Sequence, residues 1–303
     1  MKPDLRTILR DLKAAARIGH TESVWAALDS ILEYPQISGN HHLDESFIKQ
    51  VILPVGQALA QPLMNPAALR PLITHTHAGV RAIAGAALAE GFLKGVNGKG
   101  LKELSALAQD PRQDVRDAVL LACALPASHA PQKQTEIYQS WLAHSSPRLQ
   151  GLALQLLPYL PEDTILQQIQ KLKNFVPPKE PGARRSLTEA ISKLGRGEYG
   201  PEILEILSGW ANDPEQYDWV ITRCLSRSWA AAYPHDSLAI LTQLAAVEGG
   251  RKKILGALKA LQRHGAQQEV QAVLQDWLAS GQPRLESAAR KAQKKSKPPK
   301  DIE

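Results

Sequence analysis

Few residues in this chain have the types and spacing that chemistry requires, and a glycine-rich stretch is the first to consider. Residues 95–100 read Gly-Val-Asn-Gly-Lys-Gly. A phosphate-binding loop needs a glycine where Leu93 stands and a serine or threonine where Gly100 stands, and it follows a strand. This stretch follows an apolar helical pattern instead. We therefore expect it to be a connector between helices.

Two histidine pairs are the next candidates, this time for metal binding. His41 and His42 are adjacent, and one residue separates His75 from His77. Neither pair has the i, i+4 spacing around a glutamate that a zinc-binding helix uses, and no cysteine or carboxylate cluster is near. We expect His75 and His77 to lie in a turn between helices, and we expect no metal site.

Nucleophilic residues offer equally little. Cys123 and Cys224 lie within apolar helical patterns without CxxC spacing, so we expect buried free thiols. No combination of serine, histidine and acid can be assigned from neighbouring positions, although catalytic triads are not local in sequence. The sequence therefore predicts no catalytic residue, no cofactor and no enzyme activity.

Basic residues carry the clearest functional signal. The formal net charge is +6, and residues 131–303 carry 23 Lys and Arg against 18 Asp and Glu. The excess gathers on segments that follow Pro/Gly/Asp-rich turns, where we find only Glu189 and Glu286 as acids. The bases on these segments are Arg184, Arg185, Lys193, Arg196, Arg223, Arg227, Arg251, Lys252, Lys253, Lys259, Arg263, Arg284, Arg290, Lys291, Lys294 and Lys295.

The segments that position these bases repeat along the chain. One position opens each apolar helical pattern, and its steps are 35, 32, 36, 33, 34 and 33 residues. Its occupants are Arg81, Arg116, Arg148, Arg184, Tyr217, Arg251 and Arg284. Trp141, Trp210 and Trp277 each precede it by seven residues, which indicates packing against the next unit. Such a period is typical of stacked helical pairs.

Each repeat is expected to contain an A helix, a short turn with breaker residues such as Ser146-Pro147 or Asp213-Pro214, and a B helix that starts at the arginine position. The predicted A segments are 69–74, 101–109, 135–143, 164–175, 203–211, 238–247 and 270–279.

Three regions follow from this pattern. Residues 1–65 are predicted to form a helical N-terminal cap, with one helix interrupted near Pro54. Residues 66–292 are the repeats, and residues 293–303 are a basic tail that we expect to be disordered. No signal-peptide pattern and no run of 18 apolar residues is present, so we predict a cytoplasmic protein without membrane contact.

The repeat resembles the HEAT family. Asp110-Pro111-Arg112-Gln113-Asp114-Val115-Arg116 matches that family's turn and B-helix opening, and Val80-Arg81 with Ala84, Ala87 and Leu88 follows its pattern. The resemblance covers roughly three quarters of the chain. It implies a right-handed all-α solenoid of about seven helix pairs, with B helices along a concave face. Tetratricopeptide repeats share the period, but their Trp-x-x-Leu-Gly opening is missing.

One departure from the HEAT pattern affects the arginines. In that family the B-helix arginine often meets a turn aspartate six residues earlier, and only Asp110 occupies this place here. We expect Arg116 to lie within hydrogen-bonding reach of Asp110. We expect most of the other arginines to lack this partner, and Arg251 and Arg284 to point to solvent or to the groove.

The resemblance therefore predicts a scaffold that binds an acidic protein partner in a basic concave groove. Trp219, Arg223 and Arg227 are spaced i, i+4 and i+8, on one helical stripe. The predicted contact residues are Arg184, Arg185, Trp219, Arg223, Arg227, Arg251, Lys252 and Arg284. The plainer alternative is a solvated basic face that keeps the helices soluble.

Nucleic-acid binding is the second hypothesis. Trp210, Asp213, Trp219 and Arg223 loosely resemble the Trp- and Arg-bearing helices of the DNA alkylation repair family, which implies a basic face for duplex DNA. The catalytic aspartate of that family has no assignable counterpart, so glycosylase activity is not expected. An accessory role like that of HEAT-like bilin lyases rests on the repeat alone. No small-molecule substrate is predicted.

Overall fold

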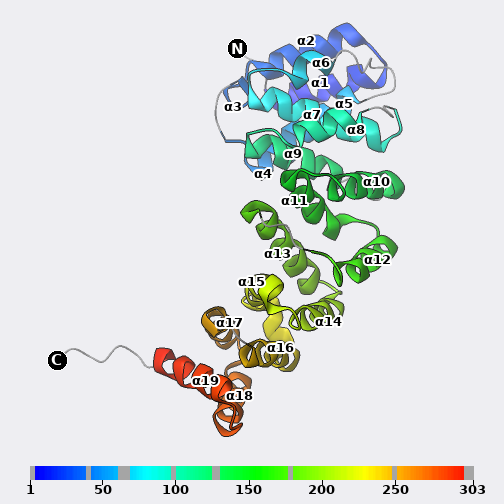
Figure 1. The fold of residues 1–303 in the computed structure, drawn as a ribbon. Helices are drawn as coiled ribbons and strands as arrows, with labels where there is room; N and C mark the ends of the chain where they lie inside the picture. Colours follow the sequence, from blue (N-terminus) through cyan, green and yellow to red (C-terminus); the bar gives the residue numbers. More distant parts are fainter. Residues whose placement is uncertain are drawn as a thin grey trace, which may run out of the picture. The chain divides into compact units, whose positions relative to one another are not determined.

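The computed structural model describes residues 4–38, 42–60, 69–96, 100–124, 130–176, 180–247 and 251–296. Every regular element within these ranges is a helix, which confirms the predicted all-α class (Figure 1). None of these helices combines the length and the apolar character that crossing a bilayer would demand. The chain divides into two compact units, residues 1–164 and 165–303, which are described separately.

The first unit contains short N-terminal helices followed by helix pairs. Its elements are α1 (Leu5–Arg17), α2 (Thr21–Leu32), α3 (Pro35–Ser38), α4 (Glu45–Phe47), the π-helix η1 (Ile48–Ile52), α5 (Leu53–Leu59), α6 (Arg70–Ile73), α7 (Ala78–Leu93), α8 (Leu101–Leu107), α9 (Gln113–Ala124), α10 (Pro131–Leu142), α11 (Pro147–Leu156) and the 3₁₀ turn η3 (Leu157–Tyr159). The boundary between the units falls within α12 (Glu162–Leu172).

Helix α7 is the centre of the first unit, because small residues let its neighbours approach closely. It packs between α5 and α9, and all of its residues except Arg81 are buried. A Cβ on Gly56 of α5 would lie 2.5 Å from the Cβ of Ala86, and one on Gly85 would lie 2.6 Å from a methyl of Val119. Glycine at these two contacts therefore sets the spacing of three helices.

The predicted interruption near Pro54 is present as a change of helix type. The π-helix η1 ends at Ile52, and α5 begins at Leu53 with Pro54 in its first turn. Proline has no N–H to donate and its ring crowds the preceding turn, so the helix widens just before it.

The second unit consists of two layers of helices. It contains the rest of α12, α13 (Pro181–Arg196), α14 (Gly200–Trp210), α15 (Pro214–Leu225), the 3₁₀ turn η4 (Ser228–Ala232), α16 (Pro234–Ala246), α17 (Arg251–Arg263), α18 (Gln267–Ala279) and α19 (Pro283–Ser296). Helices α13, α15, α17 and α19 pack successively in the B layer, while α14, α16 and α18 form the A layer (Figure 1). Apolar side chains from both layers form the core between them.

Three buried tryptophans connect successive A segments. Each was predicted to pack against the next repeat, and the hydrogen bond of each indole runs to the preceding repeat. Trp141 donates its indole N–H to Ser105 Oγ at 2.9 Å in the first unit. In the second unit, Trp210 donates to the Lys173 carbonyl at 3.2 Å and Trp277 to Thr242 Oγ1 at 3.0 Å. A buried indole needs an acceptor, and each one finds it 35 to 37 residues earlier in the chain.

The prolines that the sequence suggested as turns belong to the helices that follow. Pro147, Pro181, Pro214 and Pro283 are each the first residue of a B helix. Proline suits this place because the first helical N–H has no intrahelical acceptor and the ring fixes φ near its helical value. Most B helices consequently begin one to three residues before the arginine position, and α17 begins at it.

The arginines that occupy the repeated position do not all have the same kind of hydrogen-bond partner. Arg81 and Arg116 are fourth in their helices and donate to the carbonyls of their own turns, His75 O at 2.8 Å and Asp110 O at 2.5 Å. Arg148 and Arg284 are second in their helices. They donate to carbonyls at the end of the A segment of the preceding repeat, Gln109 O and Ala246 O. None of Arg81, Arg148 and Arg284 has an aspartate six residues earlier, as expected, but each has a different structural partner.

Asp110 links two repeats through its carboxylate. Arg81 donates to it from Nε at 2.7 Å and from Nη2 at 3.1 Å, 29 residues away in sequence. The same carboxylate accepts the backbone N–H of Arg112 at 2.9 Å. Arg116 does lie within hydrogen-bonding reach of Asp110, as predicted, but it contacts the backbone carbonyl.

Helix α19 continues to Ser296, so the prediction of a disordered tail from residue 293 is wrong for residues 293–296. Residues 297–303 lie outside the described part of the chain, as do residues 61–68 around the predicted start of the repeats.

Replacing Asp110 with alanine is expected to destabilise the first unit by about 3 kcal/mol. The change leaves the largely buried Arg81 guanidinium without its ion-pair partner and removes the acceptor of the Arg112 backbone N–H. Urea unfolding followed by circular dichroism measures the change. The control Glu136→Ala breaks an exposed pair with Lys133 and should cost less than about 1 kcal/mol. Equal losses in the two variants would contradict the assigned role of Asp110.

Candidate binding surface

Most of the predicted contact residues that the structure describes are exposed, and all of these belong to the second unit. Arg185 on α13, Arg223 on α15, Arg227 after α15 and Arg284 on α19 are exposed, whereas Arg184 and Trp219 are half-buried. Arg251 and Lys252 open α17, and their side chains lie outside the described residues. The described members of the set are therefore spread over α13, α15, the segment after α15, and α19.

One close contact within this set joins neighbouring helices. The guanidinium of Arg184 on α13 lies over the ring of Trp219 on α15, with its carbon 4.8 Å from the ring centroid. The indole N–H of Trp219 donates to Gln216 O at 2.9 Å, which fixes the ring. This cation–π contact contributes about 1 kcal/mol. It gives both residues a structural role beside any role in binding.

The predicted stripe of Trp219, Arg223 and Arg227 does not form as one helical face. Helix α15 ends at Leu225, and Arg227 has an extended backbone just before η4. The hydroxyl of Ser226 bonds back to Thr222 O, where it competes with continuation of the helix. Trp219 and Arg223 remain one turn apart on α15, and Arg227 extends the exposed basic surface beyond the helix end.

The charge contrast within α15 is weaker than the sequence suggested. This helix starts at Pro214, so Glu215 also belongs to the B layer, and Asp218, which follows the predicted start at Tyr217, was likewise left out of the predicted acid count. Even so, Arg185, Arg223 and Arg227 make no ion pair with any carboxylate of the described residues. These three guanidiniums therefore keep their charge at the surface.

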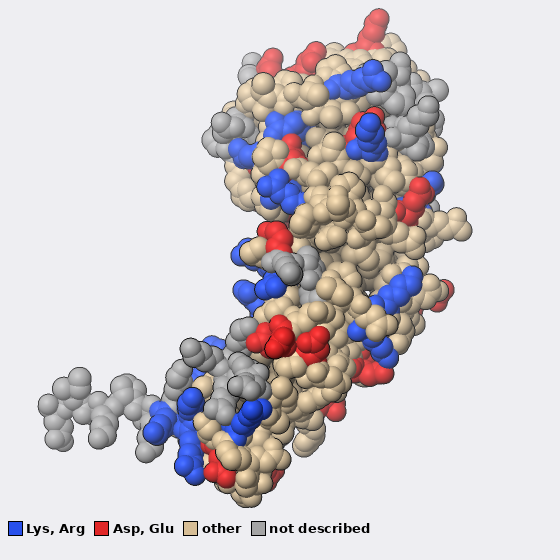
Figure 2. Space-filling model, viewed as in Figure 1, with Lys and Arg blue, Asp and Glu red and all other residues tan. Residues whose placement is uncertain are grey.

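Helix α19 carries a further concentration of bases. Pro283, Glu286, Ser287, Arg290, Lys291 and Lys294 line a shallow depression of about 400 Å³. Arg290 pairs with Glu286 at 3.3 Å, and Lys291 and Lys294 are exposed. Figure 2 shows Lys and Arg side chains gathered at this end of the second unit.

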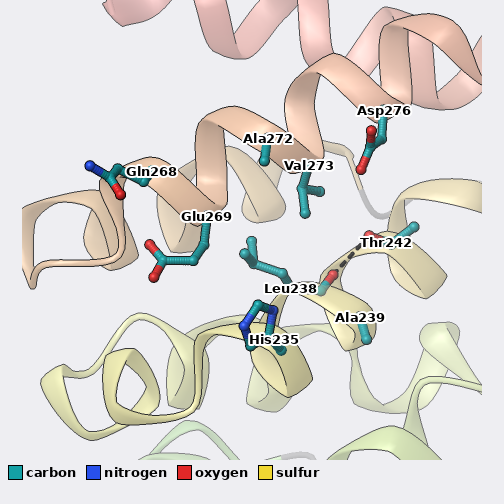
Figure 3. Close-up of a pocket in the computed structure, with 9 residues that line it drawn as sticks. All are labelled: His235, Leu238, Ala239, Thr242, Gln268, Glu269, Ala272, Val273 and Asp276. Atoms are coloured by element: carbon teal, nitrogen blue, oxygen red, sulfur yellow. Dashed lines mark hydrogen bonds between the residues drawn. The ribbon is translucent and has the colours of Figure 1, made fainter.

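The A layer of the same unit has the opposite charge. A groove of about 590 Å³ runs between α16 and α18, with an apolar floor that includes Leu238, Ala272 and Val273 (Figure 3). Glu269 and Asp276 lie along its α18 side, and the lining contains no lysine or arginine. The sequence-based assignment of bases to B segments and acids to A segments therefore holds for this part of the unit.

The residues that suggested a DNA alkylation repair protein serve mainly to hold helices together. Trp210 is buried and stacks on Tyr217 with ring centroids 4.7 Å apart. Asp213 caps α15 by accepting the backbone N–H of Gln216 at 3.4 Å. Tyr217 in turn donates to Phe175 O at 3.0 Å. Trp229, which breaks the phase of the repeat, packs buried against Gly195 of α13.

The metal and phosphate candidates of the first unit gain no support. No cluster of three or more potential metal ligands occurs among the described residues. His75 accepts the backbone N–H of His77 at 3.1 Å, as expected for a turn, and burial together with the charges of His77 and Arg81 lowers the pKa of His75. Within the glycine-rich stretch, residues 97–99 lie outside the described part.

Sequence reasoning missed a cavity of about 380 Å³ in the first unit. Its lining is His42, Leu43, Glu45, Ile48, Asp117, Leu120, Leu121 and Tyr159. These residues come from three segments that are far apart in the chain. The nearest local signal was a pair of aspartates, Asp114 and Asp117, three residues apart on one apolar helix.

Comparison with known proteins assigns no family. No protein-family model matches the chain, and a search of curated proteins found no match. The resemblance to the HEAT family therefore stays a prediction from the sequence.

Both thiols are expected to be unreactive in the folded protein. Cys123 and Cys224 are free and buried, and burial raises the pKa of each, that of Cys224 to about 12. Thiolate is the reactive form, so at about pH 8 an aromatic disulfide reagent should react with neither. After denaturation it should release two equivalents per chain. Rapid reaction of one thiol in the native protein would contradict this picture of the core.

Proposed function

We propose that this protein is a non-enzymatic scaffold that binds an acidic protein partner through the B layer of its second unit. The observation that carries the proposal is the exposed set of Arg185, Arg223 and Arg227, whose charges no described carboxylate balances. Guanidinium groups suit carboxylates because two parallel N–H donors match two oxygens. Several such contacts, spread over neighbouring helices, favour an extended acidic surface over a small ligand.

The architecture that we propose is a right-handed solenoid of about seven HEAT-like helix pairs, in a cytoplasmic protein. Two observations support it. Helices of each layer follow one another within the second unit, and buried tryptophans bond to acceptors 35 to 37 residues earlier. A solenoid presents each new repeat beside the last, so that bases from successive B helices add to one surface.

Nucleic acid is the second candidate partner, and the surface of α19 favours it. Arg290, Lys291 and Lys294 lie around one depression on this helix, and clustered bases neutralise phosphates without reading sequence. The half-buried Trp219 is covered by Arg184, which leaves it poorly placed to stack on an exposed base. We therefore place an acidic protein first.

Replacing Arg185, Arg223 and Arg227 together with glutamine is expected to weaken binding of a fluorescent polyglutamate peptide by at least about tenfold, because each charge-assisted contact contributes about 1 kcal/mol or more. Fluorescence anisotropy at low salt measures the change. The matched control replaces Arg6, Lys13 and Arg17 of α1, which are exposed bases of the first unit, with glutamine. This control removes the same charge and should bind like the wild type.

Labelled duplex and single-stranded DNA and RNA, titrated at two salt concentrations, separate the two candidates. A nucleic-acid binder should lose about 0.9 in log K per neutralised phosphate for each tenfold rise in salt. Tight binding of nucleic acid with such a slope, and none of polyglutamate, would promote the second candidate. If neither probe binds at low salt, or if both triple variants weaken equally, the basic surface of the second unit is not the binding site.

A further inference from the structure

The cavity of the first unit combines an apolar wall with acidic groups. Leu43, Ile48, Leu120 and Leu121 supply apolar surface, Glu45 and Asp117 supply carboxylates, and Tyr159 supplies an aromatic ring. No lysine or arginine is among its lining residues. Its volume of about 380 Å³ lies in the range of small-ligand sites, which begins near 300 Å³.

Asp117 is the unusual group of this cavity. Its carboxylate is half-buried, and Gln113 donates to its Oδ1 at 2.6 Å. No ion pair joins it to any lysine or arginine of the described residues. The nearby Arg116 donates instead to the carbonyls of Asp110 and Pro111 and to the side chain of Gln113.

Asp114, one helical turn earlier in the same helix, is a buried acid whose carboxylate is paired with a cation and hydrogen-bond donors. It is almost fully buried, and Arg112 donates to its two oxygens at 3.3 and 2.9 Å. The backbone N–H of Leu43 adds a contact at 3.4 Å. Burial alone would raise the pKa of Asp114, but the bonds from Arg112 and Leu43 outweigh it and the pKa is lowered.

Asp117 has the opposite balance. Burial raises its pKa, and the bond from Gln113 and the charge of Arg116 only partly offset this. The other charged groups around the cavity are His42, Asp114, and Glu45 with its partner Lys49, 2.5 Å away. A half-buried acid without an ion-pair partner, in a cavity, is a candidate binding group for a ligand that supplies the opposite charge.

We propose that this cavity binds an organic cation, an ammonium or guanidinium group on an alkyl stem, with the cation against Asp117 and the stem along Leu120 and Leu121. Tyr159 adds an aromatic ring at the wall, which suits a cation as well as an apolar stem. Anions are disfavoured because two carboxylates line the site, and Glu45 already has Lys49 as its partner. The source is either a free alkyl amine or a lysine or arginine side chain of a protein.

This site lies in the first unit, so the proposal does not rest on the basic surface of the second. The unpaired carboxylate of Asp117 also has a consequence for the stability of the fold. A raised pKa in the folded state means that ionised Asp117 destabilises the fold at neutral pH, and that protonation in acid relieves the cost. Asp117→Asn should therefore raise the melting temperature at about pH 7, and the gain should disappear as the pH falls below the raised pKa.

The binding test uses butylamine and the methylamides of Nα-acetyl-lysine and Nα-acetyl-arginine, whose side chains keep their charge. Each is titrated into the full chain and followed by isothermal calorimetry and ligand-observed NMR. Butanol and butyrate serve as neutral and anionic controls. We expect saturable binding of at least one cation, in the millimolar range or tighter, and none of butanol or butyrate. Binding should weaken as the pH falls, because protonated Asp117 no longer attracts a cation.

Three variants locate the site. Asp117→Asn should weaken binding by at least about tenfold, since it removes a charge but keeps the shape. Asp29→Asn, the same change at an exposed site on α2, should bind like the wild type. Glu45→Gln should have a smaller effect than Asp117→Asn, because Lys49 already balances Glu45.

Preference for acetyl-lysine or acetyl-arginine methylamide over butylamine would indicate a protein side chain as ligand, and equal affinity a free amine. The proposal is overturned if no cation saturates the wild type, if butanol or butyrate binds equally well, or if Asp117→Asn retains wild-type affinity. It is also overturned if Glu45→Gln weakens binding more than Asp117→Asn does.

Discussion

Hydrogen bonds from three buried indole N–H groups to acceptors one repeat earlier are the interaction that links successive helix pairs. Trp141, Trp210 and Trp277 are almost fully buried, and each satisfies its N–H on the A segment before its own. A tryptophan in this position has its N–H paired only if the preceding helix pair lies one repeat back. The bond therefore fixes the distance between successive pairs, while apolar contacts between the layers supply most of the stabilisation.

The repeat and the helical class could be predicted because they depend on side chains that recur at a period of about 34 residues. The partners of the arginines could not, because most are backbone carbonyls, which every residue supplies. Arg81 and Arg148 look equivalent in sequence, yet one bonds within its own turn and the other reaches the preceding A segment. Arg81 is the fourth residue of its helix and Arg148 is the second, and this difference in phase decides which carbonyl lies in reach.

The two candidate sites differ in how far sequence could reach them. Bases such as Arg185 and Arg223 lie on helices whose exposed faces follow from apolar periodicity, so their exposure was predictable. Of the acids of α15, Glu215 was missed through an error in the helix start, and Asp218 was overlooked although it follows the predicted start. The cavity beside Asp117 draws on residues near 45, 119 and 159. Tertiary packing alone brings these segments together, and the local pattern of α9 gives no sign that Asp114 is satisfied while Asp117 is not.

Charged and neutral donors both anchor the helices of this protein, and the kind of donor affects where charge remains at the surface. In the first unit, Arg81 is anchored by the carboxylate of Asp110, and the pair has little net field. In the second unit, the bonds between repeats include neutral donors, the indoles of Trp210 and Trp277 and the hydroxyl of Tyr217. Hydrogen bonds from these neutral groups do not require a basic side chain to be paired inside the fold. Arg185, Arg223 and Arg227 are exposed and make no ion pair with a described carboxylate, and their field is directed to solvent, where an acidic surface can meet it.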